Sequence, residues 1–416
     1  MIFRERVKPV EQHARAFLKW SLLGVLMGLI GGPIGAAFHH VLHFVTHLRG
    51  ENTWLIWLLP VGGLLSVGVY WLLGMMKNRG TNQLIDAVLH TDAVSPRVAP
   101  LIFIVTAITH LFGGSAGREG AALQLGGSLG STLAKFLKLD KEERTVLIMS
   151  GMSAVFAGLF GTPLTACVFV LEFASVGRIF TPALVPCFLS AFTAWEMAQK
   201  LGVHAETYLL TTALPINLTT VWQLAVLAVL VAILGIIMCR IFHGAEHLAA
   251  KHIKNPWLRI AMGGAVVTAM TLVAGDHRFN GAGMDMALKA VAGEADWYSF
   301  AVKLLFTTVT LAAGFKGGEI VPTFCIGATF GCVVGGLLGM DPGVAAALGM
   351  VGLFCSGTNA TLASIILSIE LFGTANLYLF AFICVVVCML SGQASLYGSQ
   401  MMKYGKISME RVRPRV

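Results

Sequence analysis

The sequence predicts an all-α membrane protein that crosses the bilayer many times, and three observations support this. Only 12% of the 416 residues are charged, where a soluble globular chain carries about 25%. Hydrophobic residues make up 56%, and the mean hydropathy is +0.78. Apolar segments of helical length also follow one another along the chain. This composition excludes a secreted disulfide scaffold, a coiled coil, a disordered chain and a soluble nucleic-acid binder.

The predicted helices are apolar segments with little sequence between them. A hydrocarbon layer about 30 Å thick needs about 20 helical residues to cross, so several segments are too short to span it alone. Two are also interrupted, at residues 161–163 (Gly-Thr-Pro) and 357–359 (Gly-Thr-Asn). Broken helices must be buried in protein or line a cavity, because lipid cannot satisfy their freed backbone groups. In chain order the segments are 18–48, 54–76, 98–113, 118–137, 145–173, 179–200, 219–243, 257–275, 298–314, 322–339, 342–372 and 375–392.

The two halves of the chain resemble each other. Residues 151–156 (Gly-Met-Ser-Ala-Val-Phe) match residues 349–354 (Gly-Met-Val-Gly-Leu-Phe), and Glu172 matches Glu370 at the same spacing. We therefore predict two inverted-topology repeats with broken helices, an architecture typical of transporters and channels and not of an anchored enzyme. The predicted division is residues 1–17, a cytoplasmic segment; 18–200 and 201–400, the two transmembrane repeats; and 401–416, a cytoplasmic tail.

Charge sets the predicted orientation. Lys and Arg outnumber Asp and Glu by 29 to 21, and the excess lies at the chain ends and in short loops. By the positive-inside rule both termini are cytoplasmic. The apolar run from 18 to 45 is too long for a signal peptide, so we expect it to stay uncleaved. The terminal basic residues are Arg4, Arg6, Lys8, Arg15, Lys19, Lys403, Lys406, Arg411, Arg413 and Arg415.

Two glycine-rich motifs place a carboxylate at the start of an apolar helix. They are residues 113–120 (Gly-Gly-Ser-Ala-Gly-Arg-Glu-Gly) and 317–322 (Gly-Gly-Glu-Ile-Val-Pro), at corresponding places in the repeat. Glycine allows backbone N–H groups to approach an ion, and a helix N-terminus carries about half a positive charge. A single motif of this kind could be an ordinary capped turn. A pair of them within the membrane instead indicates an anion site beside an ion or proton path.

These motifs resemble those of the CLC chloride channels and anion/proton antiporters, and the resemblance runs from about residue 18 to 400. Residues 117–120 (Gly-Arg-Glu-Gly) are similar to the family's G-[KR]-E-G-P, with Ala121 in place of the proline. Residues 318–322 (Gly-Glu-Ile-Val-Pro) are similar to its G-x-F-x-P, with Ile320 in place of the phenylalanine. The family's late tyrosine matches Tyr397.

Three departures resemble the bacterial fluoride branch of that family. Chloride-handling members carry G-S-G-I-P ahead of the first motif, whereas this chain has residues 80–86 (Gly-Thr-Asn-Gln-Leu-Ile-Asp) there. The acidic Glu319 is similar to that branch. Chloride exchangers also carry an internal glutamate at a position that holds Phe173 here, next to Glu172. The resemblance therefore implies fluoride before chloride.

What the resemblance implies is a fluoride/proton antiporter that exports fluoride, without a cofactor or a catalytic residue. Glu119 would occupy the anion position when ionised and leave it when protonated, and Glu319 would be a second acid on the path. The implied partners are fluoride or chloride, protons, the lipid bilayer and a second copy of the chain, in a bacterial inner membrane, with no nucleic acid. The expected anion-binding residues are Gly80, Thr81, Asn82, Gly117, Arg118, Gly120, Ile320, Val321 and Tyr397.

Alternatives remain for function and for two other motifs. A chloride/proton antiporter or chloride channel of the same family is the second hypothesis. His243, Glu246 and His247 fit the H-x-x-E-H pattern of zinc peptidases, so an intramembrane metalloenzyme is a third, although a solvated interfacial face explains the histidines better and we predict no metal site. Glu172 and Glu370 could bind protons, but a structural role at helix ends is favoured.

Overall fold

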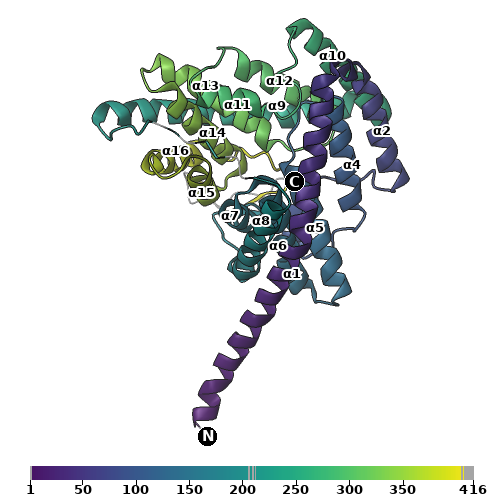
Figure 1. The fold of residues 1–416 in the computed structure, drawn as a ribbon, viewed down its shortest axis with the longest axis vertical. Coiled ribbons are helices and arrows are strands. Elements are labelled where there is room, and N and C mark those ends of the chain that lie inside the picture. Colours follow the sequence, from purple (N-terminus) through teal and green to yellow (C-terminus); the bar gives the residue numbers. More distant parts are fainter. Residues whose placement is uncertain (1, 205–206, 209, 211, 404–405, 407–416) are drawn as a thin grey trace.

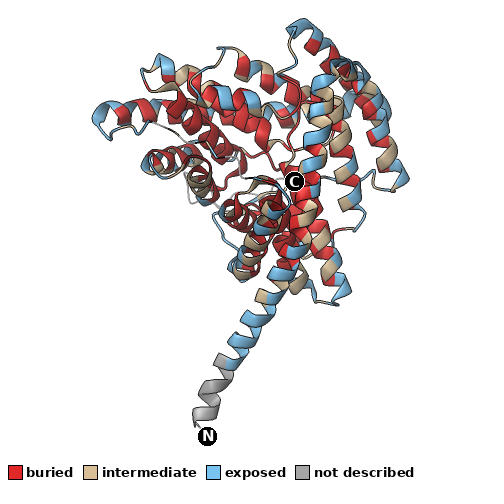
Figure 2. Cartoon of the chain, in the orientation of Figure 1, coloured by how far each residue is buried: buried red, intermediate tan, exposed pale blue. Residues whose placement is uncertain are grey.

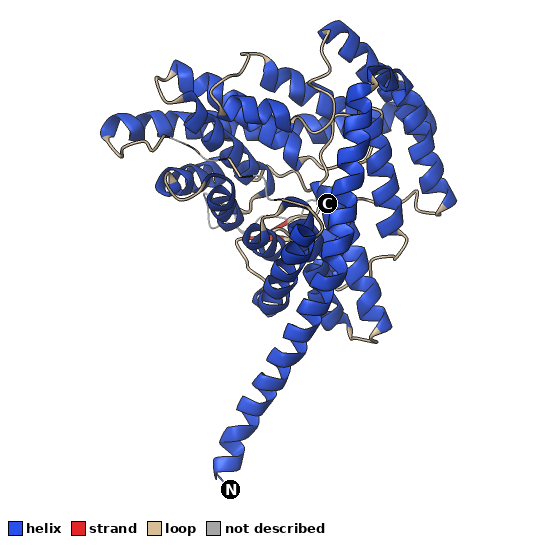
Figure 3. Cartoon of the chain, viewed as in Figure 1, coloured by secondary structure: helices blue, strands red, loops and turns tan. Residues whose placement is uncertain are grey.

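The computed structural model describes residues 2–204, 207–208, 210, 212–403 and 406, with backbone alone for residues 2–10. The described part is almost entirely helical (Figure 3). The first half contains α1 (Ile2–Glu51), α2 (Leu59–Leu72), α3 (Thr81–His90), α4 (Val98–Leu111), α5 (Glu119–Phe136), α6 (Lys141–Phe160), α7 (Pro163–Glu172) and α8 (Leu184–Lys200). The second contains α9 (Leu218–His252), α10 (Pro256–Ala274), α11 (Met284–Val291), α12 (Ser299–Ala313), α13 (Ile320–Leu337), α14 (Pro342–Thr358), α15 (Thr361–Phe372) and α16 (Leu377–Leu390).

The predicted all-α membrane architecture is confirmed. Within the described residues, six helices are long and apolar enough to cross a membrane, and the shorter apolar helices lie among them. Buried residues fill the inner helices, while many large apolar side chains of the outer helices are exposed (Figure 2). An exposed apolar surface of this extent suits lipid and not water.

Three features of the helices differ from the sequence prediction. The first helix begins at Ile2, so the predicted segment 1–17 is largely its continuation, which projects from the body of the protein (Figure 1). No Gly or Pro interrupts residues 10–23, so nothing stops the helix there. The short helices α3 and α11 were not predicted, because each is amphipathic and contains no long apolar run.

Both predicted breaks are confirmed. The apolar segment 145–173 forms α6 and α7, separated at Gly161, and 342–372 forms α14 and α15, separated at Asn359. Gly161 and Asn359 end their helices in the left-handed conformation, with φ of 72° and 59°. A residue in this conformation commonly ends a helix, and its backbone N–H donates to a carbonyl of the last turn.

The repeat appears as two equivalent helix pairs. A side chain at Gly126 of α5 would overlap the carbonyl oxygen of Gly151 in α6, and Gly327 of α13 has the same relation to Gly349 in α14. Such close backbone approach is typical of small-residue packing between membrane helices. The following helices are capped alike: Asp140 accepts a hydrogen bond from Glu143 N (2.8 Å), and Asp341 accepts one from Val344 N (2.9 Å).

The two repeats run in opposite directions. The α5–α6 connection lies near the N-terminal end of α1, because Lys19 forms an ion pair with Glu143. The C-terminal end of α13 lies near a different helix, because Leu338 O accepts a hydrogen bond from Gln223 at the start of α9 (2.7 Å). The C-terminal ends of α5 and α13 thus lie near different helices, α1 and α9, which agrees with the predicted inverted repeats.

Glu172 and Glu370 each cap a helix of the other repeat. Glu370 accepts hydrogen bonds from the backbone N–H groups of Leu164 and Thr165 at the start of α7, both at 2.9 Å. Glu172 does the same at the start of α15, with Ala363 N at 3.0 Å. These contacts match the favoured structural role. They also join the two halves, because α7 and α15 belong to different repeats.

Candidate functional site

The two glycine-rich motifs meet at the centre of the protein. Gly117 N donates to Gly318 O and Gly318 N donates to Gly117 O, each at 2.7 Å, which forms an isolated antiparallel bridge. Because α5 begins two residues after Gly117 and α13 two residues after Gly318, the bridge holds both helix N-termini against each other. Backbone N–H groups of two helices thus converge where negative charge is favoured.

Glu119 occupies this junction and is completely buried. Its Oε2 accepts hydrogen bonds from the backbone N–H of Arg118 (3.1 Å) and from that of Val321 in the first turn of α13 (3.2 Å). One carboxylate oxygen is therefore shared by both repeats. The other oxygen, Oε1, is buried without a hydrogen-bond partner among the described residues.

Glycine is required at the bridge because the carboxylate lies against it. A Cβ at Gly318 would lie 2.8 Å from the backbone nitrogen of Glu119 and 2.9 Å from that of Gly120. Real Cβ atoms do not approach backbone this closely. A Cβ there would also overlap Glu119 Oε2, so only glycine leaves room for the carboxylate.

A third helix N-terminus, that of α3, approaches the same point. Gly80 precedes it with a φ of 63°, and Gly80 N donates to Asn78 Oδ1 (2.8 Å). Thr81 Oγ1 lies only 3.0 Å from the position that a Cβ on Gly120 would take. The Thr81 hydroxyl therefore sits beside the first turn of α5, next to Glu119.

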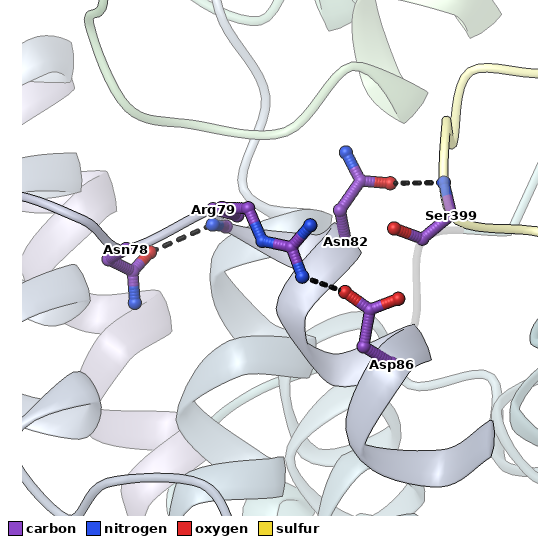
Figure 4. Close-up of polar contacts among 6 residues, drawn as sticks. Asn78, Arg79, Asn82, Asp86 and Ser399 are labelled. Carbon is purple, nitrogen blue, oxygen red and sulfur yellow. Dashed lines mark hydrogen bonds and ion pairs between the residues drawn. The ribbon is translucent and has the colours of Figure 1, made fainter. Parts of the chain in front are cut away.

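Asn82 has a different orientation, which Figure 4 shows. Its Oδ1 accepts a hydrogen bond from Ser399 N at 3.0 Å, so its amide joins α3 to the C-terminal segment. One turn later, Asp86 forms an ion pair with Arg79. Thr81 thus faces α5, while the amide oxygen of Asn82 is used to hold the segment that carries Tyr397.

Tyr397 is buried, and its hydroxyl has no hydrogen-bond partner among the described residues. The hydroxyl interacts electrostatically with the carboxylates of Glu119 and Glu319. Its ring packs edge-on against Phe173, with centroids 6.1 Å apart. Gln400 fixes this segment by donating to Phe173 O and Thr358 O, each at 2.8 Å.

Glu319 follows the bridge glycine Gly318 and is the N-cap residue of α13. Its backbone oxygen accepts from Thr323 N (3.0 Å) and Thr323 Oγ1 (2.8 Å), while its carboxylate interacts with the charges of Glu246, Glu119 and Lys316. Glu246 belongs to the H-x-x-E-H pattern. The described residues contain no group of three or more His, Cys, Asp or Glu arranged to hold a metal, and His243 Nε2 is bonded to Ser395 O (2.8 Å).

Arg118 reaches the site through its backbone N–H, which donates to Glu119. The guanidinium turns away, over the ring of Phe160 (5.1 Å to the centroid) and toward His39 Nδ1 (3.4 Å). Ile320 and Val321 are both buried at the start of α13, and only Val321 N is hydrogen-bonded to Glu119.

A buried lysine behind the first motif was not identified from the sequence. Lys303 of α12 donates to Ser115 Oγ (3.0 Å), Phe279 O (3.0 Å) and Gly281 O (2.7 Å), so its ammonium is fully hydrogen-bonded. Because α12 belongs to the second repeat and Ser115 to the first, this lysine ties the turn before Glu119 to the other half. A charged residue within the apolar segment 298–314 was the signal that could have revealed it.

Replacing Lys303 with methionine is expected to lower the thermal unfolding midpoint and to slow transport. The change keeps most of the volume but removes the donor to two buried carbonyl oxygens, those of Phe279 and Gly281, at about 1–3 kcal/mol for each unsatisfied group. Differential scanning fluorimetry in detergent measures the midpoint. Lys289→Met, at an exposed position on α11, is the control and should leave it unchanged; equal midpoints for the two variants would contradict the role of Lys303.

Comparison with known proteins gives four relevant similarities. Residues 67–393 match the profile of the voltage gated chloride channel family. The chain is 33% identical over 395 residues to a chloride/fluoride channel protein of Pseudomonas syringae pv. tomato, a match that covers 93% of this chain and 87% of that protein. A crystal structure of a CLC-type fluoride/proton antiporter superposes with a TM-score of 0.89 at 30% identity, covering 92% of this chain and 98% of the other. That of a slow cyanobacterial Cl⁻/H⁺ antiporter superposes with a TM-score of 0.74 at 20% identity, over 91% and 94%, which is a likeness of fold.

Proposed function

The chain belongs to the voltage-gated chloride channel family, and from this premise we propose that it is an antiporter that exports fluoride in exchange for protons. The observation that carries the proposal is the carboxylate of Glu119, buried and hydrogen-bonded at the N-termini of two helices from opposite repeats. A carboxylate oxygen and a halide ion can each accept hydrogen bonds from the same backbone N–H donors. The geometry therefore supports a site that either one can occupy.

Exchange follows from this competition. Ionised Glu119 fills the anion position with Oε2 and blocks the path. Protonation removes its charge and weakens its hold on the N–H groups, since hydrogen bonds to an ionised acceptor are about twice as strong as neutral ones. The neutral side chain then leaves, an anion takes the position, and deprotonation restores the block. Each cycle therefore couples binding of the anion to release of the proton.

The donors around Glu119 favour fluoride as the anion. Fluoride is small and strongly hydrated, so it needs compact donors in place of its water. The hydroxyl of Thr81 lies beside α5, and that of Tyr397 has no other partner within the described residues. The antiporter of fluoride and protons that resembles this chain over nearly its whole length adds support. Chloride/proton exchange is the second candidate, since chloride appears in the names of the other relatives.

The proposal also covers the membrane, the orientation of the chain in it and the oligomeric state. We infer a bacterial inner membrane with both termini cytoplasmic, from the basic chain ends, and a homodimer in which each subunit has its own path, from family resemblance. Gly80, Asn82 and Gly117 would shape the site through backbone conformation and packing, and Glu319 would either carry protons or hold its loop.

The fluoride proposal predicts that purified protein in liposomes releases fluoride at least about tenfold faster than chloride, which corresponds to about 1.4 kcal/mol of difference in barrier. Ion-selective electrodes measure both rates from vesicles loaded equally with the two anions, and a pH-sensitive dye records the proton movement. Equal rates with proton coupling would establish the chloride alternative instead. Release of either anion without proton movement would contradict antiport.

A further inference from the structure

Several histidines lie near the C-terminal end of α1, where the helix reaches a membrane surface. An α-helix rises 1.5 Å per residue, so the stretch from Lys19 to His39 spans about 30 Å, which equals the thickness of the hydrocarbon layer. Lys19 pairs with Glu143 beside the α5–α6 connection, at one surface. The histidines therefore lie at the opposite surface; they are His39, His40, His43 and His47.

Two of these histidines face each other on one side of the helix. His39 and His43 are one turn apart, and their rings are parallel within 7°, with centroids separated by 6.5 Å. Residues at this spacing are neighbours on a helix surface. His39 is partly buried and His43 is exposed. His40 has a different orientation, because its Nε2 lies 2.8 Å from Leu201 O and its ring is nearly perpendicular to that of His39.

The ring of His39 turns one nitrogen toward the protein. Its Nδ1 lies 3.4 Å from Leu159 O, at the end of α6, and 3.4 Å from Arg118 Nη1. A neutral imidazole carries its proton on one nitrogen only. With the proton on Nδ1 the ring donates to Leu159 O, and with the proton on Nε2 it accepts from Arg118. A histidine that binds a metal commonly donates its other N–H to a carbonyl oxygen or a carboxylate, and Leu159 O is such an acceptor.

Imidazole nitrogens are suitable ligands for Zn²⁺, Ni²⁺ and Cu²⁺. We propose that His39 Nε2 and the ring of His43 bind one divalent transition-metal ion, with water completing its coordination. A bound zinc ion lies about 2.0–2.1 Å from each ligating nitrogen, so the two rings must approach slightly from their present separation. The exposed His43 can rotate to do this. The proposal goes beyond the sequence analysis, which predicted no metal site.

The ion would influence the anion site through Arg118. Binding at His39 Nε2 fixes the proton on Nδ1, which then donates to Leu159 O and can no longer accept from Arg118. The guanidinium loses this contact. Arg118 directly precedes Glu119, and its backbone N–H donates to Glu119 Oε2 (3.1 Å). This coupling rests on the proposed function, whereas the metal site itself does not.

Calorimetric titration of the tag-free protein with NiCl₂ tests the site. We expect saturable binding of one ion per chain, weakened tenfold or more in His43→Ala and in His39→Gln. His40→Ala is the matched control, since His40 is an exposed histidine of the same helix with another orientation, and it should bind Ni²⁺ normally. His47→Ala should also bind normally. The absence of saturable binding in the wild type would mean that the two rings only stack. Loss of binding in His47→Ala together with normal binding in His39→Gln would also overturn the proposal.

Fluoride release from liposomes with saturating Ni²⁺ on both sides of the membrane tests the coupling. The rate should change by about two- to tenfold in the wild type, the range that loss of one hydrogen bond gives, and should not change in His43→Ala. A wild type that binds Ni²⁺ and transports at an unchanged rate would overturn the coupling. If the wild type moves no fluoride at all, the proposed function fails, and the titration still decides whether the metal site exists.

Discussion

Replacing Glu119 with glutamine is expected to abolish proton coupling. Glutamine has the shape of the protonated acid and cannot release a proton or carry the charge that competes with an anion. Proton movement driven by a fluoride gradient should fall by about 10²-fold or more, the size of effect that follows loss of a positioned proton-transfer group. Simultaneous recording of fluoride and pH in liposomes measures it, and any fluoride that still moves should do so without protons.

Glu172→Gln is the matched control for this variant. Glu172 is a partly buried glutamate in an apolar helix and its carboxylate caps α15, where the amide oxygen of glutamine can still accept the hydrogen bond from Ala363 N. Coupling should therefore be retained. If Glu119→Gln still exchanged fluoride for protons at the normal rate, Glu119 would not be the gate and the proposed mechanism would be wrong.

The sequence was sufficient to predict the architecture because a chain that crosses a membrane many times must contain many apolar segments of helical length. The paired motifs, the helix breaks at Gly161 and Asn359, and the matching N-caps Asp140 and Asp341 all depend on local residue types. The two glycine-rich motifs hold equivalent places in the two halves, which predicted that they would meet. The Gly117–Gly318 bridge is the structural counterpart of that prediction.

What the sequence could not provide was the direction of individual side chains. Thr81 and Asn82 are adjacent and both polar, yet one lies beside α5 and the other is bonded to Ser399, more than 300 residues away along the chain. The partners of Lys303 lie in two loops whose meeting depends on tertiary packing.

The bridge glycine provides the second large effect. Gly318→Ala is expected to reduce fluoride transport to the level of empty liposomes, because the added methyl group would lie 2.8 Å from Glu119 N and 2.9 Å from Gly120 N. These are backbone atoms at the start of α5 and cannot rotate away as a side chain would. The bridge to Gly117 must open, and the two helix N-termini must separate. Displacement of reacting groups by about 1 Å can cost about 10²-fold in rate.

Gly336→Ala separates this local effect from a general one. Gly336 lies in the same helix, α13, and a Cβ there meets only Pro342 Cγ, at 4.0 Å. Alanine is favoured over glycine within a helix by about 1 kcal/mol, so this variant should transport normally and unfold no earlier than the wild type. Electrode flux and fluorimetry on both variants give the comparison. Normal fluoride flux in Gly318→Ala would mean that the ion does not pass between the facing tips of α5 and α13, because no anion site there could tolerate a methyl group against its backbone donors.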